Sequence, residues 1–186
     1  MKVYGDRGSS NTRRVLTTAA YLGLDVEFVF LDLFSGQNRT PEYLALNPNG
    51  TIPTFVDGDV VLFEASAIMI YLAEQAGSSL LPSGKAKYET LKWMFWAAEH
   101  FRRGPTVLIE QRFMERLKGH AENPTLVAEA LHAIHRYTAV LEGHLSTRRF
   151  MVGDGLTLAD IDLAAPLSHI PRTQAPFLEY PHVAAW

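Results

Sequence analysis

The first 75 residues alternate between short apolar runs and segments with helical periodicity. Residues 2–5 form a short β-type run, and residues 26–31 are rich in β-branched and aromatic side chains. Between them, residues 11–22 carry apolar side chains at helical spacing. Gly23 follows, where a helix commonly ends in a left-handed residue. A strand, a helix and a strand in this order predict a βαβ unit with two parallel strands.

A second group of elements completes this pattern. Thr40-Pro41 predicts an N-cap and a first helical proline, opening a short helix to about Leu46. The strands expected at 54–56 and 60–63 flank Asp57-Gly58, a turn sequence that favours a tight hairpin. Residues 65–75 are mostly apolar and predict a further helix. The predicted order is therefore β-α-β-α-β-β-α.

The chain changes character after this helix. Residues 77–84 are rich in Gly, Ser and Pro, which indicates a linker. Beyond it we find no convincing strand, and helices are predicted over 86–101, over 106–118, from Asn123-Pro124 and from about Leu158. Thr157 and Asp160 have the spacing of a capping box, with Asp in place of the usual Glu or Gln. We therefore predict an α/β domain over residues 1–76 and an all-helical domain over residues 85–186.

Composition narrows the functions that this chain can have. With 186 residues, 47% of them hydrophobic, the chain can bury a sizeable core. A net charge of -3 offers no basic surface for nucleic acid. The absence of cysteine excludes disulfides, thiolate metal sites and a cysteine nucleophile, so any thiol chemistry must use a thiol of the ligand.

Two further kinds of site or location are not expected. The seven histidines show no HExxH or comparable spacing, so we expect no metal site. No apolar run reaches the roughly 18 residues of a membrane span, and the start of the chain is unlike a signal peptide. We therefore expect a soluble, cytoplasmic protein with no membrane partner.

Polar residues gather between the first strand and the first helix, where Ser9, Ser10 and Asn11 follow Gly8. In an α/β unit, ligands bind beyond the carboxyl ends of strands, and a helix N-terminus offers free N–H groups and a positive dipole end. The same residue types are also the commonest N-caps. Both interpretations stay open from the residues alone.

Two longer motifs carry a family resemblance. The stretch from Asn47 to Phe55, NPNGTIPTF, resembles the NPxGxVPxL segment of the glutathione transferase superfamily, and FEASAI, residues 63–68, resembles its xESxAI segment. The similarity extends over nearly the whole chain and includes VGDGLTLADI and the closing YPHVAAW. It implies a thioredoxin-like N-terminal domain, a short linker and a helical C-terminal domain.

The resemblance also implies how glutathione is held. It implies a cis Ile52-Pro53 bond, with the backbone N–H and C=O of Ile52 turned toward the cysteinyl part of glutathione. Glu64 matches the acid that receives the γ-glutamyl ammonium group. The next position usually holds a serine for the γ-glutamyl carboxylate, whereas this chain has Ala65, which keeps the N–H but lacks the hydroxyl. Ser66 is expected to compensate in part.

At the other end of glutathione, Gly36-Gln-Asn-Arg39 resembles the loop that binds the glycine carboxylate in plant-type serine classes. Arg39 stands at the basic position and Asn38 replaces a histidine. The alternative is that Arg39 is a solvated cation on a loop.

The resemblance to the serine classes implies the catalytic group. There, a serine at the end of the first strand donates its hydroxyl hydrogen to the glutathione sulfur and stabilises the thiolate. The spacing to Arg13 matches Ser9 to this serine, with Ser10 or Asn11 as alternative donors. SSNTRRV also resembles the SSCxWRV of maleylacetoacetate isomerases, although this chain has Asn11 in place of the cysteine.

In the helical domain, which the resemblance makes the site of the electrophile pocket and of dimer contacts, Trp93, Trp96 and His100 lie near one helix face. They predict either a core cluster or an apolar pocket wall, with His100 or Arg102 available to a polar group. We expect Glu99, Arg102 and Arg103 to form a solvated or subunit-facing edge. Family members usually continue beyond YPHVAAW into a helix that covers the pocket, so a chain that ends there is expected to have an open pocket.

We therefore predict a cytosolic, homodimeric, serine-type glutathione transferase of the theta and plant-like kind. Its co-substrate is glutathione, and its other substrate is a small hydrophobic electrophile, as in detoxification. The alternatives are a glutathione-dependent isomerase or dehalogenase, a peroxidase, and a non-catalytic binding or regulatory protein.

Overall fold

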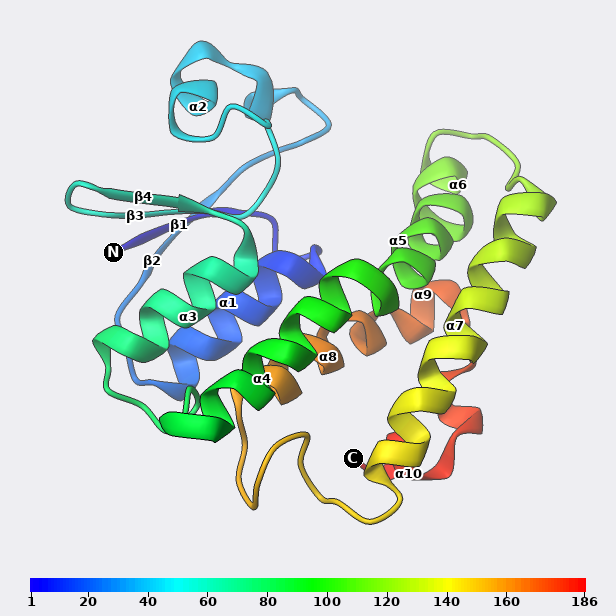
Figure 1. Cartoon of the computed structure of the whole chain (residues 1–186). Coiled ribbons are helices and arrows are strands. Elements are labelled where there is room, and N and C mark those ends of the chain that lie inside the picture. The colour runs from blue at the N-terminus through cyan, green and yellow to red at the C-terminus, as the bar shows by residue number, and fades with distance from the viewer. The chain divides into compact units, whose positions relative to one another are not determined.

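The computed structural model describes all residues from 1 to 186. The chain divides into two compact units, Met1–Leu81 and Pro82–Trp186. The first contains a four-stranded sheet with helices, and the second contains helices and no strand (Figure 1).

The first unit has the predicted order of elements. These are β1 (Lys2–Gly5), α1 (Ser10–Tyr21), β2 (Glu27–Phe30), the 3₁₀ turn η1 (Gln37–Arg39), α2 (Pro41–Leu46), β3 (Thr54–Asp57), β4 (Val60–Phe63) and α3 (Ala65–Gln75). The sheet has the order β2-β1-β3-β4. β1 and β2 are parallel, whereas β3 is antiparallel to both β1 and β4. The predicted parallel pair, the hairpin and the thioredoxin-like fold are thus confirmed.

Side-chain alternation along the strands decides which helix covers which face of the sheet. Val3 and Phe55 are opposite each other in the register and fully buried. Tyr4 points the other way and meets Tyr43 of α2, with 6.2 Å between the ring centroids. Accordingly, α1 and α3 lie side by side on one face and α2 lies on the other (Figure 1).

Two predicted helix ends are also confirmed. Thr40 is the N-cap of α2, and its hydroxyl accepts from the N–H of Tyr43 at 3.3 Å, with Pro41 as the first helical residue. Gly23 follows α1 with a φ of 67°, the left-handed conformation expected there.

The second unit is entirely helical, as predicted. Its elements are α4 (Gly84–Trp96), η2 (Ala97–Phe101), α5 (Arg103–Ile109), η3 (Glu110–Met114), α6 (Glu115–Leu117), α7 (Pro124–Leu145), α8 (Leu158–Ala164), η4 (Ala165–His169), α9 (Ile170–Thr173), η5 (Pro176–Glu179) and α10 (Pro181–Ala185). α5 packs closely on α7 because Gly104 has no Cβ; an added Cβ would lie 2.9 Å from the carbonyl oxygen of Ala130.

The two helices predicted over 86–101 and 106–118 each contain a π-helical turn that the sequence pattern did not predict. Helical backbone runs on between them, and both η2 and η3 are π-helical turns. The N–H of Arg102 donates to the carbonyl of Ala97, five residues back. Pro105 has no N–H for the carbonyl of Phe101, and the wider turn precedes this proline.

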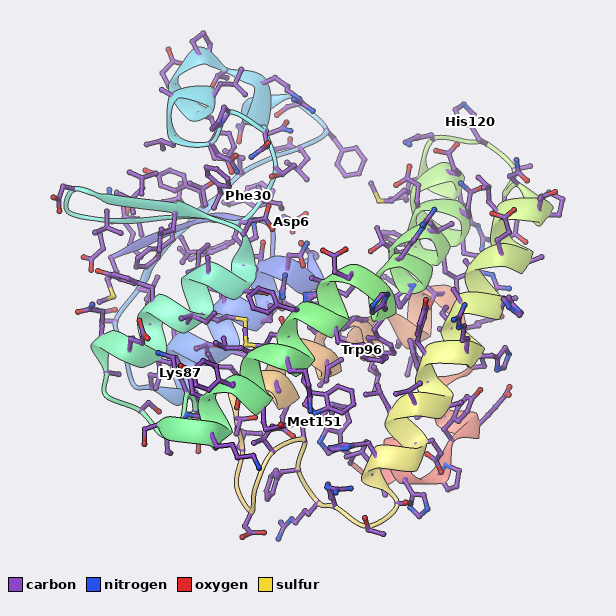
Figure 2. All side chains as sticks on the ribbon, in the orientation of Figure 1. Asp6, Phe30, Lys87, Trp96, His120 and Met151 are labelled. Carbon is purple, nitrogen blue, oxygen red and sulfur yellow. The ribbon has the colours of Figure 1, made fainter.

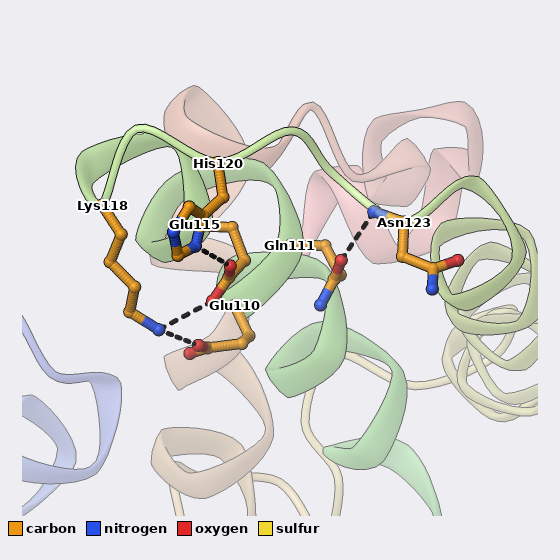
Figure 3. Close-up of polar contacts among 6 residues, drawn as sticks. All are labelled: Glu110, Gln111, Glu115, Lys118, His120 and Asn123. Carbon is orange, nitrogen blue, oxygen red and sulfur yellow. Dashed lines mark hydrogen bonds and ion pairs between the residues drawn. The ribbon is translucent and has the colours of Figure 1, made fainter.

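A cluster of charged side chains closes the turn between α6 and α7 (Figure 3). Lys118 donates to Glu110 at 2.8 Å and to Glu115 at 2.7 Å, and His120 contacts Glu115 at 2.8 Å. The hydrogen bonds from Lys118 and then His120 lower the pKa of Glu115 to about 2. The side chain of Asn123, the predicted start of α7, accepts from the first backbone N–H groups of that helix.

Asp160 is a buried carboxylate that accepts hydrogen bonds from several segments of the second unit. The predicted capping box with Thr157 is confirmed: the Asp160 carboxylate accepts from the N–H of Thr157 at 2.9 Å and from its hydroxyl at 2.8 Å. It also accepts from the N–H of Met151 at 2.8 Å and the indole N–H of Trp186 at 3.1 Å. One buried side chain thereby joins the start of α8 to two other segments.

We expect Asp160→Ala to lower the free energy of unfolding by about 2–4 kcal/mol, because several buried donors lose their acceptor at once. Urea denaturation followed by circular dichroism measures this loss. The matched control is Asp154→Ala, which alters an exposed residue of the preceding loop and is expected to change the free energy by less than about 0.5 kcal/mol. Equal effects of the two substitutions would contradict the role of Asp160.

Candidate functional site

The register of the sheet brings four loops to one edge. Phe30 at the end of β2 is opposite Gly5 at the end of β1, and Tyr4 is opposite Thr54, where β3 begins. Thr54 in turn is opposite Phe63, the last residue of β4. The residues that follow β1, follow β2, precede β3 and follow β4 therefore meet at this edge. Every site residue that the sequence predicts in the first unit lies in one of these four segments.

The loop after β1 is a hydrogen-bonded turn that delivers Ser9 to the start of α1. The Asp6 carboxylate accepts from the N–H of Gly8 at 2.7 Å, and the Asp6 carbonyl accepts from the N–H of Ser9 at 3.0 Å. Figure 2 shows Asp6 beside Phe30 at the ends of their strands. Ser9 is the N-cap of α1, while Ser10 and Asn11 are the first helical residues, and all three are half-buried.

The cap and the ligand-binding interpretations of Ser9 are chemically compatible. As a cap, its Oγ accepts weakly from the N–H of Thr12 at 3.5 Å. Accepting uses a lone pair and leaves the hydroxyl hydrogen available as a donor. The 12-residue helix α1 adds the positive end of its dipole at the same place. The site can therefore stabilise an anion beside Ser9.

The segment before β3 is held by two buried polar side chains. Asn47 is fully buried, and its amide donates to the carbonyl of Thr51 at 2.9 Å and to Thr54 Oγ1 at 3.1 Å. The Tyr43 hydroxyl donates to the same Thr51 carbonyl at 2.6 Å and lies 2.8 Å from Thr54 Oγ1. These bonds fasten the chain on both sides of Ile52-Pro53.

The bond between Ile52 and Pro53 is cis, as the resemblance implied. The N–H and C=O of Ile52 make no hydrogen bond within the chain. A donor and an acceptor on one residue are therefore left for an extended ligand, which would bind as an added strand does.

The loop after β2 docks onto this same segment. Asn38 donates its amide to the carbonyl of Gly50 at 2.6 Å, and Arg39 donates to the carbonyl of Asn49 at 3.4 Å. Gly50 has a φ of 61°, and an added Cβ would lie 2.7 Å from the Arg39 guanidinium. Arg39 is exposed yet anchored, so its guanidinium has one fixed contact and further donors facing solvent.

The segment after β4 contains the most unusual backbone of the site. Glu64 has a φ of 69° and a ψ of 106°, a combination that non-glycine residues rarely adopt and that costs about 1–3 kcal/mol. It precedes α3 without capping it through its side chain, and its carboxylate is exposed. Ala65 is buried, and Ser66 accepts from the Nη1 of Arg14 at 2.9 Å. Backbone strain of this kind gathers at ligand sites.

In the second unit, the structure corrects one expectation. Arg102 does not lie on a solvated edge: its guanidinium bonds the fully buried carboxylate of Asp162, with Nη1 to Oδ1 at 3.3 Å. The Arg102 guanidinium is therefore paired inside the second unit, because a buried Asp162 carboxylate without a partner would cost free energy. Sequence spacing could not show this, since the partner is 60 residues away.

Two aromatic residues of α4, Trp93 and Trp96, pack within the second unit. Trp96 stacks on Phe101, with 5.9 Å between centroids, and meets Tyr137 of α7 at the same distance. Trp93 lies 4.6 Å from the ring of His144 and is largely buried. The exposed ring of His100 stacks on Tyr137 at 5.6 Å. Core packing thus accounts for Trp93 and Trp96.

Comparisons with known proteins identify the family. Residues 1–74 match the model of the glutathione S-transferase N-terminal domain, and residues 106–186 match that of the C-terminal domain. Glutathione S-transferase 3 of Zea mays is 36% identical over the whole chain, which spans 86% of that protein. The chain belongs to the glutathione S-transferase family.

Solved structures of the glutathione S-transferase family have the same fold. Glutathione transferase F7 from Populus trichocarpa is 30% identical and superposes with a TM-score of 0.93 over the whole chain and 90% of its own. A glutathione S-transferase-I bound with lactoylglutathione is 29% identical, with a TM-score of 0.90 over the same shares.

Three residues at this edge were missed as contributors by sequence reasoning. Asn47 is part of the NPNGTIPTF motif, but a local motif does not show the buried hydrogen bonds of its side chain. Tyr43 has the local pattern of any core aromatic residue, and Arg14 that of any cation on a helix.

No group of His, Cys, Asp or Glu side chains is arranged to hold a metal ion, and none of the helices combines the length and apolar character of a membrane span.

We expect the Tyr43 bonds to make stability fall at high pH. Burial raises the pKa of the Tyr43 hydroxyl above its usual value of 10, an effect that its bond with Thr54 partly offsets. A pKa raised by folding gives stability that is complete below the unfolded pKa and is lost as pH rises through the folded pKa. Tyr43→Phe should therefore lower the free energy of unfolding by about 1–2 kcal/mol at pH 8 and by less above pH 11.

Urea denaturation at pH 8 and above pH 11 measures the free energy of unfolding of the wild type and of Tyr43→Phe. Tyr88→Phe, which alters a largely exposed tyrosine, is the matched control and is expected to change neither value. A Tyr43→Phe loss of equal size at both pH values would show that the hydroxyl stabilises the segment without titrating.

Proposed function

We propose that this protein is a glutathione transferase that joins the thiolate of glutathione to small hydrophobic electrophiles. The observation that carries the proposal is the meeting, at one edge of the sheet, of the Ser9 hydroxyl, the free N–H and C=O of Ile52, and the exposed Glu64 carboxylate. Each fits a different group of one tripeptide. The relatives named above as glutathione transferases support the same activity.

In this proposal, the N–H and C=O of Ile52 pair with the cysteinyl backbone of glutathione, next to Pro53. Glu64 receives the γ-glutamyl ammonium group, and the helix start at Ala65 and Ser66 receives the neighbouring carboxylate. Arg39 and Asn38 hold the glycine carboxylate at the other end. The solved structure of a glutathione S-transferase-I bound with lactoylglutathione supports the proposal, because a relative with this fold accepts a glutathione conjugate.

The proposed chemistry needs a thiolate. Ser9, with Ser10 and Asn11 as neighbouring polar groups, donates its hydroxyl hydrogen to the glutathione sulfur and so favours the charged form. The dipole of α1 acts in the same direction, and helix N-termini and nearby cations lower thiol pKa values from about 8.5 to roughly 3.5–7.5. The thiol proton leaves to water, the sulfur forms a bond to the electrophilic carbon, and the leaving group departs with its electron pair.

We further propose a cytoplasmic homodimer in which residues 1–76 form the glutathione-binding domain and residues 85–186 form the domain for the electrophile and for dimer contacts. α4 exposes Tyr88 and Phe95 by 71% and 62%. These aromatic residues are seven apart, on one helix face, and such a face is suited to a partner subunit. Sedimentation equilibrium should give a dimer, and Phe95→Glu should give monomers, with Leu117→Glu as the exposed control.

Ala65 favours a second candidate function. A binding or regulatory protein of this fold would not need the hydroxyl that the family pattern has at this position. Such a protein would bind glutathione without lowering the pKa of its thiol. The thiolate measurement below separates the two candidates.

We expect the pKa of bound glutathione to lie well below about 8.5 in the wild type and to return toward that value in Ser9→Ala. The pH dependence of thiolate absorbance in the ultraviolet, at saturating protein, measures it. Turnover of an aromatic halide should fall at least tenfold in Ser9→Ala while the dissociation constant of glutathione changes little. The matched control is Ser10→Ala, and a larger effect of that substitution on the thiol pKa would show that Ser10 is the donor. A thiol pKa that is not lowered in the wild type would favour the second candidate function, a binding or regulatory protein.

We expect Arg39→Ala to raise the dissociation constant of glutathione about tenfold, because a charge-assisted hydrogen bond to the glycine carboxylate is lost. Isothermal titration calorimetry measures the constant, and the thiol pKa of the bound ligand should not change. Arg7→Ala, at another exposed cation of the first unit, is the matched control. An unchanged dissociation constant of glutathione in Arg39→Ala would show that Arg39 is a solvated cation on the loop.

A further inference from the structure

A cavity of about 350 Å³ lies between the sheet and α2, on the face opposite α1 and α3 (Figure 1). Its sheet side includes Tyr4 of β1 and Val29 of β2, which are opposite each other in the register. Apolar residues that follow β2 or belong to α2 also line it, namely Leu31, Tyr43 and Leu46. Ligand cavities commonly have volumes of about 300–1,000 Å³ and mostly apolar walls with a few polar groups. This cavity therefore suits a small molecule with an apolar body.

The polar groups of the cavity come from η1 and the start of α2. The oxygens of Gln37 and Thr40 are already used within the chain: Gln37 accepts from the N–H of Asp32 at 2.8 Å, and Thr40 caps α2. Glu42 is exposed, and its carboxylate makes no hydrogen bond or ion pair. Among the residues that line the cavity, Glu42 alone is charged. The cavity therefore has one free charge, and that charge is negative.

The geometry of α2 brings this charge together with apolar surface. Glu42 and Leu46 are four residues apart, so they lie on the same face of the helix. The Tyr43 hydroxyl is bonded to Thr51 and Thr54, so Tyr43 gives the cavity ring surface rather than a free polar group. A ligand that packs its apolar body against these residues can place a polar end on the carboxylate.

We propose that this cavity binds small organic cations that carry an aromatic ring, with the ring against Tyr4 and Tyr43 and the ammonium group on Glu42. Aromatic rings pack favourably on one another, and a cation is attracted both by a carboxylate and by a ring face. No residue that lines the cavity is among those proposed to bind glutathione. The inference therefore goes beyond the proposed function and does not depend on it.

The first experiment compares two ligands of nearly equal shape. Tryptamine carries an ammonium group, and tryptophol has a hydroxyl in its place. Calorimetry should give tryptamine a dissociation constant below about 1 mM, and about fivefold lower than that of tryptophol. Glu42→Gln should weaken tryptamine about fivefold and leave tryptophol unchanged. The matched control is Asp59→Asn, which removes an exposed acid from the turn between β3 and β4 and should change neither constant.

The second experiment locates the bound ligand. Leu46→Trp fills part of the cavity and should weaken tryptamine and tryptophol alike by about tenfold, with circular dichroism as the check that the variant is folded. If this larger side chain prevents folding, Glu42→Gln still decides the question, because it alters an exposed residue. Saturation of the wild type with S-hexylglutathione, a glutathione conjugate, should change the tryptamine constant by less than about twofold.

The outcomes separate this inference from the proposed function. Equal constants for tryptamine and tryptophol in the wild type, no binding of either, or unchanged tryptamine binding in Glu42→Gln would overturn the inference. Displacement of tryptamine by S-hexylglutathione would also overturn it, because tryptamine would then occupy the site proposed for the conjugate. A wild type that binds tryptamine through Glu42 but does not bind S-hexylglutathione would contradict the proposed function and support the inference.

Discussion

The hydrogen bonds from Tyr43 and Asn47 to Thr51 and Thr54 are the constraint on which the site depends. They hold a segment in which main-chain atoms, rather than side chains, face the proposed ligand. Backbone groups have no rotamers to adjust, so the position of Ile52 is only as definite as the bonds around it. The buried amide and phenol supply these bonds from the face of the sheet opposite α1 and α3. The loop that carries Asn38 and Arg39 then docks onto this segment through Gly50.

Local donors, rather than net charge, suit this edge of the sheet to an anion. The chain has a net charge of -3, and its overall field does not attract a tripeptide with two carboxylates. Instead, the N-termini of α1 and α3, the guanidinium of Arg39 and the buried cation of Arg14 lie in the segments that meet at this edge or in the helices that start there. Such fixed donors act over short distances, so they select for the position of a charge more than for its presence.

The helical unit depends on buried carboxylates for its internal order. Asp160 collects donors from three segments, and Asp162, two residues on, pairs with Arg102. Both acids lie on the short helix α8, whose apolar residues Leu158, Ile161 and Leu163 are buried beside them. Buried ionic bonds are costly unless every partner is present, which makes the arrangement specific even where it adds little stability.

The sequence by itself determined the order of elements, the hairpin, the caps at Thr40 and Thr157 and the family, because each depends on residues close together in the chain. It also named the candidate residues Ser9, Arg39, Ile52 and Glu64 through motifs of a few residues. Tertiary structure alone decided the partners of long-range contacts: Arg14 with Ser66, Arg102 with Asp162, and Tyr43 with Thr51 and Thr54. An arginine or a tyrosine has the same local pattern whether its polar end meets solvent or a buried partner. The difference lies in which helix and strand pack together, and hydrophobic periodicity predicts that a face is buried without naming what it is buried against.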